Sequence, residues 1–123
     1  MSRNKEQSNQ GNEPRFEVRL LIYYGLEPQN LRADYSINLS TGGVFLETTE
    51  TLPVDTNLFI MFKLPGNDTV IKCNSRVAWT LDIGTFKKPS LPSGMGLQFM
   101  NYPKETLRAI RDFIDTNDLA PSS

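Results

Sequence analysis

The stretch Asn38-Leu39-Ser40-Thr41-Gly42-Gly43 decides the fold, because it sets short polar side chains and two glycines between apolar segments. Residues 32–39 before it and residues 44–46 after it have the alternating or apolar character of β-strands. Residues 40–43 then form the turn between them, and serine and glycine are residues that such turns require. Taken alone, the hexapeptide is explained by turn geometry, so any further meaning depends on the residues around it.

Two arginines, Arg15 and Arg19, stand four positions apart upstream of this turn. In an extended segment their Cα atoms lie about 13 Å apart, so two long side chains can converge on a ligand from both sides. A guanidinium group binds a phosphate or the guanine O6/N7 edge with two hydrogen bonds and also stacks on a base. An isolated pair of this spacing is equally typical of solvated surface charge.

The hexapeptide supplies groups that complement these arginines. Asn38 carries an amide donor and acceptor, Ser40 carries a hydroxyl group, and Gly43 lets the backbone approach a ligand where a Cβ atom would obstruct it. Arginines, a polar turn and exposed backbone together suit a guanine nucleotide with its phosphates.

Arg-x3-Arg followed by Asn-x-Ser-x-x-Gly resembles the two-part signature of the PilZ domain, a bacterial receptor module for the second messenger cyclic di-GMP. The sequences of residues 77–79 (Val-Ala-Trp) and 94–99 (Gly-Met-Gly-Leu-Gln-Phe) are similar to late PilZ strands, so the resemblance runs from about residue 15 to 117. It implies a mainly β fold: a small antiparallel barrel of about six strands, with the arginine motif at its mouth and a C-terminal α-helix.

The resemblance also implies the ligand-binding residues. They are Arg15, Arg19, Asn38, Ser40, Gly42 and Gly43. Trp79 is expected in the core, but an aromatic residue at this position in relatives can lie near the nucleotide, so it is a further candidate. Many PilZ domains have another arginine directly before the motif, which is associated with binding a stacked ligand pair. Pro14 stands there, so we expect one cyclic di-GMP molecule per domain.

The apolar pattern predicts the remaining elements. Strands are expected over residues 16–26, 32–39, 44–46, 58–64, 69–81 and 95–99, and a helix opens at residues 101–103 and runs to about 117. In the second strand, Ala33, Tyr35, Ile37 and Leu39 are expected on one face. The helix carries an apolar stripe of Leu107, Ile110, Phe113 and Ile114, which either packs on the barrel or docks a partner.

Composition limits the organisation and location of the chain. Its 123 residues suit one domain over residues 15–118, between a flexible polar tail over 1–14 and a C-terminal tail over 119–123. No apolar run reaches the ~20 residues of a membrane span, and residues 1–14 do not resemble a signal peptide, which together favour a cytoplasmic protein.

Composition also excludes several functions. Histidine is absent, which removes the common catalytic triads and the commonest zinc ligand, so we expect no catalytic residues, no metal and no bound cofactor. A net charge of −1 argues against a nucleic-acid binder. The single cysteine, Cys73, lies in an alternating apolar segment and is expected as a buried structural thiol.

The resulting hypothesis is a non-catalytic cyclic di-GMP receptor that relays the signal to a separate protein, in motility, pilus function or biofilm control as the family implies. The alternative is an adaptor with the PilZ fold that acts through protein contacts without nucleotide. An enzyme or an RNA-binding barrel ranks behind both. The pattern assigns no role to the loop over residues 84–94, where Lys87 and Lys88 are either solvated charge or a ligand or partner contact.

Overall fold

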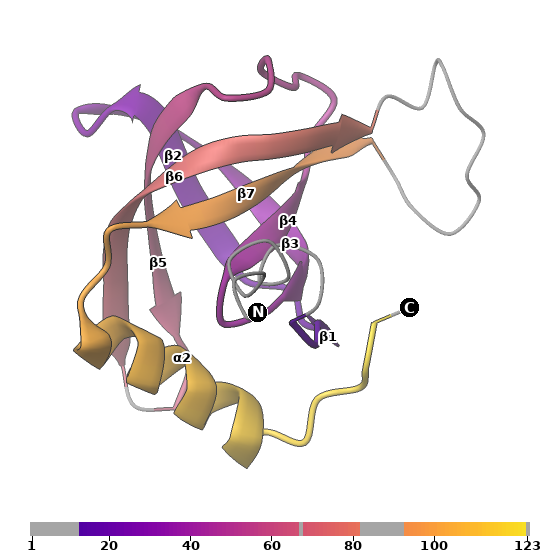
Figure 1. Cartoon of the computed structure of the whole chain (residues 1–123), viewed down its shortest axis with the longest axis vertical. Helices are drawn as coiled ribbons and strands as arrows, with labels where there is room; N and C mark the ends of the chain where they lie inside the picture. Colours follow the sequence, from indigo (N-terminus) through magenta and orange to yellow (C-terminus); the bar gives the residue numbers. More distant parts are fainter. Residues whose placement is uncertain (1–12, 67, 82–92, 123) are drawn as a thin grey trace, which may run out of the picture.

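Antiparallel strands close into a barrel in the computed structural model, which describes residues 13–66, 68–81 and 93–122 (Figure 1). The strands are β1 (Phe16–Glu17), β2 (Leu21–Glu27), β3 (Asn30–Leu39), β4 (Gly43–Glu47), β5 (Asn57–Leu64), β6 (Thr69–Leu81) and β7 (Gly94–Met100). One helix, α2, covers Lys104–Thr116 within the described ranges. Residues 1–12 and most of the 84–94 loop, including Lys87 and Lys88, lie outside the described residues.

The strand order is β1-β3-β2-β5-β6-β7-β4, and a further β3–β4 pairing closes the six strands β2 to β7 into a barrel. Every pairing is antiparallel. β1 is a short addition beside the end of β3, where Phe16 pairs with Leu39. The predicted fold class, a small antiparallel barrel of about six strands followed by a helix, is therefore confirmed.

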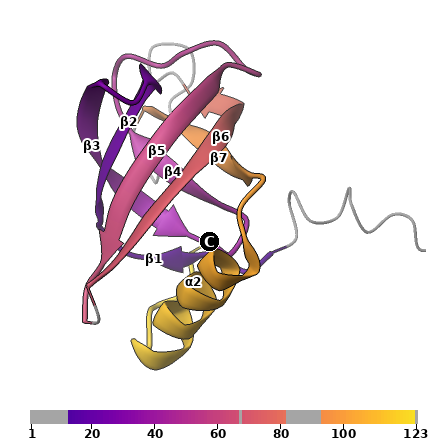
Figure 2. The ribbon, with the colours of Figure 1, turned by 90° about the vertical axis from the view of Figure 1, so that its left-hand side faces the viewer.

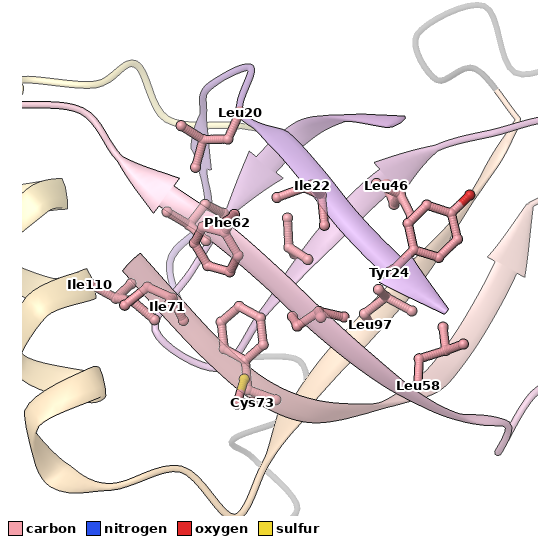
Figure 3. Close-up of a cluster of buried hydrophobic side chains, with 14 of the residues drawn as sticks. Leu20, Ile22, Tyr24, Leu46, Leu58, Phe62, Ile71, Cys73, Leu97 and Ile110 are labelled. Atoms are coloured by element: carbon pink, nitrogen blue, oxygen red, sulfur yellow. The ribbon is translucent and has the colours of Figure 1, made fainter. Parts of the chain in front are cut away.

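The barrel interior is filled by the alternate side chains of its strands (Figure 3). The fully buried members with the largest side chains include Ile22, Tyr24, Leu46, Ile60, Phe62, Leu64 and Ile71. Cys73 lies among these side chains, and burial raises the pKa of its thiol to about 11. The prediction of a buried structural cysteine is confirmed.

Helix α2 lies across one end of the barrel (Figure 2). Pro103 stands at its N-cap, where the missing N–H of proline costs no helical hydrogen bond. Ile110 and Phe113 are buried in the same core as the strands, and Ile114 packs against it. The apolar stripe therefore covers its own barrel, and the alternative of a partner-docking stripe is not needed.

The strand expected over residues 16–26 is interrupted between β1 and β2. The hydroxyl group of Ser36 fills the interruption, accepting the Leu20 N–H at 2.9 Å and donating to the Val18 carbonyl oxygen at 2.6 Å. The β3–β4 register shifts at the same level, between Ser36 and Asn38. A polar side chain thus completes an irregular backbone ladder, in which Val18 N–H still donates to the Ile37 carbonyl oxygen and Ser36 N–H to the Leu20 carbonyl oxygen.

This irregularity makes one sequence expectation wrong. Ala33, Tyr35, Ile37 and Leu39 do not share one inner face, because a bulge reverses the alternation within β3. Leu39 is fully buried, whereas Tyr35 is 45% exposed. Asn38 contacts Arg15, and Tyr35, on the other side of the bulge, contacts Arg19.

Candidate ligand-binding site

The turn over residues 40–43 is built from its own groups. The Ser40 hydroxyl oxygen accepts the N–H of Gly42 at 3.1 Å and of Gly43 at 3.2 Å, while the Ser40 N–H donates to the Gly43 carbonyl oxygen at 2.9 Å. Ser40 is fully buried. The serine therefore has a structural role in the turn, and its predicted contact with a ligand remains a prediction.

Two glycines make a flat backbone floor on the outer side of β4 and β7. A Cβ atom on Gly43 would collide with the Leu97 carbonyl oxygen, and a Cβ atom on Gly96 would collide with the indole ring of Trp79. Both positions need glycine because neighbouring groups approach so closely. Because neither glycine has a side chain, a ligand lying on this surface can contact the strand backbone directly.

A pocket of about 210 Å³ lies over this floor. Gly42 and Gly43 line it together with Arg15, Trp79 and Gln98. The structure therefore brings together four of the candidate residues from distant parts of the sequence.

Trp79 forms one wall of the pocket instead of entering the core. Its side chain is 42% exposed and stacks on Phe45, with ring centroids 5.0 Å apart and planes inclined by 13°. The expectation that Trp79 is a core residue is wrong, because its side chain lies on the outer face, over Gly96 and Phe45. An exposed indole face at a pocket can stack on a nucleobase.

Arg15 joins the two halves of the sequence signature. Its Nε donates to Asn38 Oδ1 at 2.7 Å, and the Asn38 amide in turn donates to Ser122 Oγ at 3.3 Å. Burial lowers the pKa of the Arg15 guanidinium, and the nearby Glu13 carboxylate opposes that shift. Arg15 is thus an oriented, partly buried cation beside the pocket.

Residues 119–123, set outside the domain as a tail, lie against this arginine up to Ser122. The Ser122 N–H donates to the Arg15 carbonyl oxygen at 2.8 Å, and the Glu17 N–H donates to the Ala120 carbonyl oxygen at 2.8 Å. Pro121 pairs with Phe16 as an isolated β-bridge. The C-terminal segment therefore extends the sheet beside β1 and fixes the backbone of residues 15–17.

Arg19 does not line this pocket. Its guanidinium lies 4.6 Å from the centre of the Tyr35 ring and 3.4 Å from the Glu47 carboxylate, and its side chain is 60% exposed. Of the two arginines of the motif, only Arg15 contacts Asn38 in this structure, whereas Arg19 contacts Tyr35 and Glu47. An exposed arginine held by one ring and one ion pair is free to re-aim at a low energetic cost.

Among the pocket-lining residues with polar side chains, sequence reasoning missed three: Glu13, Gln98 and Tyr102. Gln98 faces the same side as its pairing partner Gly43, and its Oε1 accepts from Arg76 Nη2 at 2.7 Å. The Tyr102 hydroxyl donates to the Thr41 carbonyl oxygen at 3.1 Å. Period-2 alternation from Gly94 and Gly96 would have indicated Gln98, whereas Glu13 was assigned to the tail.

Residues 13–66, 68–81 and 93–122 contain no group of three or more Asp, Glu or Cys side chains placed to hold a metal ion. No helix among them has the length and apolar character of a membrane crossing.

Comparisons with known proteins agree with this architecture. The PilZ domain model matches residues 9–116, so the chain belongs to the PilZ domain family, which confirms the resemblance seen in its two motifs. The fold is similar to that of the Bacillus subtilis inhibitor of motility, MotI/DgrA, with a TM-score of 0.69 and 16% sequence identity over 87% of this chain. The match spans 50% of the MotI/DgrA chain. A search of curated proteins found no match.

Proposed function

We propose that this protein is a non-catalytic receptor for cyclic di-GMP that relays the signal to a partner protein. The observation that carries the proposal is the contact between Arg15 and Asn38, which unites the two signature motifs beside a pocket floored by glycine. A partly buried, oriented guanidinium next to a glycine backbone and an exposed indole suits a ligand that combines phosphate with a flat base.

Each group has a distinct role in this proposal. Arg15 binds a phosphate or a guanine edge, Trp79 stacks on a base, and the backbone at Gly42 and Gly43 approaches the ligand closely. Asn38 orients Arg15, and Asn38 and Ser40 offer hydrogen bonds to the ligand once it displaces their present partners. Arg19 swings from Tyr35 toward the ligand and closes the site from the other side.

The proposed stoichiometry is one cyclic di-GMP molecule per domain. Pro14 has no side-chain donor and cannot supply the third guanidinium that a stacked pair of ligands would use. The asparagine at position 38 is neutral, so it accepts and donates hydrogen bonds but offers no carboxylate to the guanine N–H edge. A lower affinity than that of relatives with aspartate follows from this difference.

The proposed output is a change in the outer barrel surface. When Arg19 leaves Tyr35 for the ligand, the exposed ring beside Leu21 on β2 is uncovered. The partner is a separate protein of motility, pilus function or biofilm control, acting in the cytoplasm, and no cofactor or nucleic acid is involved. The fold neighbour whose name describes an inhibitor of motility supports this range of processes.

The second candidate is a PilZ-fold adaptor that does not bind nucleotide. It is favoured by the fact that Ser40, Asn38 and Arg15 already have protein partners, so the two motifs also serve the turn and the C-terminal segment. The two candidates differ in one measurable property, the binding of the dinucleotide.

Isothermal titration with cyclic di-GMP separates them. We expect saturable binding with one ligand per chain, loss of binding in Arg15→Ala and Arg19→Ala, and no change in Arg111→Ala, which alters an exposed arginine of α2. A flat isotherm for the unmodified protein would leave the adaptor as the function. Two ligands per chain would contradict the role given to Pro14.

A further inference from the structure

An acidic side chain already lies in the proposed anion site. Glu13 lines the pocket beside Arg15, and a Cβ atom on Gly42 would collide with the Glu13 carboxylate. The carboxylate is also within hydrogen-bonding reach of the Ser40 hydroxyl. It therefore touches the turn at Gly42.

The groups around Glu13 are the groups expected to hold a ligand. A carboxylate and a phosphate present the same kind of oxygen acceptors to a guanidinium group, a hydroxyl group and a backbone N–H. Because the Arg15 charge, the Ser40 hydroxyl and the turn at Gly42 lie around one carboxylate here, a phosphate at the same place would meet the same groups. Both anions cannot lie there together, since like charges at contact distance repel strongly.

The position of Glu13 follows from the residue after it. Pro14 restricts the preceding residue to an extended conformation and has a fixed φ itself, so the Glu13 side chain is tied to the placement of Arg15. Pro14, which stands where many relatives have a further arginine, thus also helps to position the Glu13 carboxylate in the pocket.

Burial disfavours the charged form of the Glu13 carboxylate, so a ligand can displace it more easily. Burial raises the pKa of Glu13, and the opposing effects of the Arg15 charge and the Ser40 hydroxyl do not cancel that rise. The pKa of Tyr102, on the other wall of the pocket, is raised by burial and then by the Glu13 charge. An anion with more donor contacts than Glu13 is therefore able to replace it.

We propose that Glu13 is an internal competitor, whose carboxylate occupies the phosphate position between Ser40, Gly42 and Arg15 and must leave before a phosphate-bearing ligand binds. This inference rests on the proposed function and adds a regulatory contact to the same site. Ligand binding then releases the segment before Arg15 from the turn. It also sets a concentration threshold, because the ligand has to displace a tethered anion.

Titration calorimetry of the full chain with cyclic di-GMP tests the inference through Glu13→Gln. We expect this variant to bind about fivefold more tightly at pH 8, because the amide keeps the shape but not the charge. Glu17→Gln is the matched control, since Glu17 is exposed and does not line the pocket, and we expect it to bind like the unmodified protein.

A second arm repeats the titrations at lower pH. Because burial raises the pKa of Glu13, its carboxylate becomes neutral at a higher pH than an ordinary glutamate does, and as the pH falls the affinity of the unmodified protein should rise toward that of Glu13→Gln. Arg15 and Tyr102, the other titratable groups at the pocket, keep their protons in this range. The emission of Trp79, the single tryptophan, should show the same acid transition without ligand, and Glu13→Gln should lack it.

The outcomes separate the two proposals. Equal or weaker binding by Glu13→Gln, with binding by the unmodified protein intact, overturns the competitor and leaves the receptor function standing. Binding by Glu13→Gln alone supports the competitor in its strongest form, in which Glu13 blocks the site. No binding by either protein overturns the receptor function and the competitor with it.

Discussion

The turn over residues 40–43 and the segment that carries Arg15 and Arg19 are the two halves of one sequence signature, yet they are held in opposite ways. The turn is fixed by backbone groups, a buried hydroxyl and a floor that admits only glycine. The arginine segment is fixed by side-chain contacts, by a strand of two residues, β1, and by a few backbone hydrogen bonds to the C-terminal segment. The turn is therefore the more rigid half and the arginine segment the more adjustable clamp, a division that suits the receptor proposed above.

Replacing a floor glycine is the strongest test of the rigid half. In Gly43→Val the new side chain meets the Leu97 carbonyl oxygen, which belongs to a paired strand and cannot move aside, so we expect a loss of about 3 kcal/mol in the free energy of unfolding. Urea denaturation measures this loss. Gly42→Ala is the matched control: the atoms nearest its new methyl group belong to the end of the Glu13 side chain, which can rotate aside, so stability should change by less than about 0.5 kcal/mol.

Removing the C-terminal segment tests how much its backbone hydrogen bonds stabilise the segment that carries Arg15. Deletion of residues 120–123 removes the hydrogen bonds from the Glu17 N–H and to the Arg15 carbonyl oxygen, and we expect a loss of about 1–2 kcal/mol. Hydrogen exchange at the Glu17 amide should accelerate while the amides of β6 stay protected. Ser122→Ala retains the backbone bonds and should leave this exchange unchanged; faster exchange there would show that the Asn38 contact matters more than the backbone pairing.

The smallest effect on stability is expected at Arg19. Its ion pair with Glu47 is exposed on both sides, so Arg19→Ala should change the free energy of unfolding by less than about 1 kcal/mol although it removes a residue of the clamp. Thermal unfolding without ligand checks this. A large destabilisation would mean that Arg19 is part of the framework, and the contrast between a rigid turn and an adjustable clamp would then fail.

Much of the fold could be predicted because its signals are local. The serine and glycines of the turn, the proline before α2 and the helical spacing of Ile110 and Phe113 each depend on neighbours in sequence. The face of β3 could not be predicted, because the Ser36 hydroxyl replaces ladder hydrogen bonds from a strand sixteen or more positions away. Such a substitution leaves no periodic pattern in the sequence.

The candidate site divides in the same manner. Arg15, Asn38, Gly42 and Gly43 were found from spacing and residue type, and the structure gathers them at one end of the pocket or beside it. The outward position of Trp79 was missed, since an aromatic residue in an apolar strand suits an inner face equally well. Glu13 was missed because a charged residue in a polar segment resembles the tail that precedes it.

The sequence by itself determined which chemical groups this protein carries and which local turns, strands and helix present them, because residue type and near-neighbour sterics act over a few positions. Only the tertiary structure decided which of those groups meet. The β4–β7 pairing brings Gly43 beside Gln98, the β6–β7 pairing places Trp79 over Gly96, and the β1–β3 pairing brings the Arg15 segment to Asn38. Contacts between residues so far apart depend on strand register and burial, which are properties of the whole folded chain.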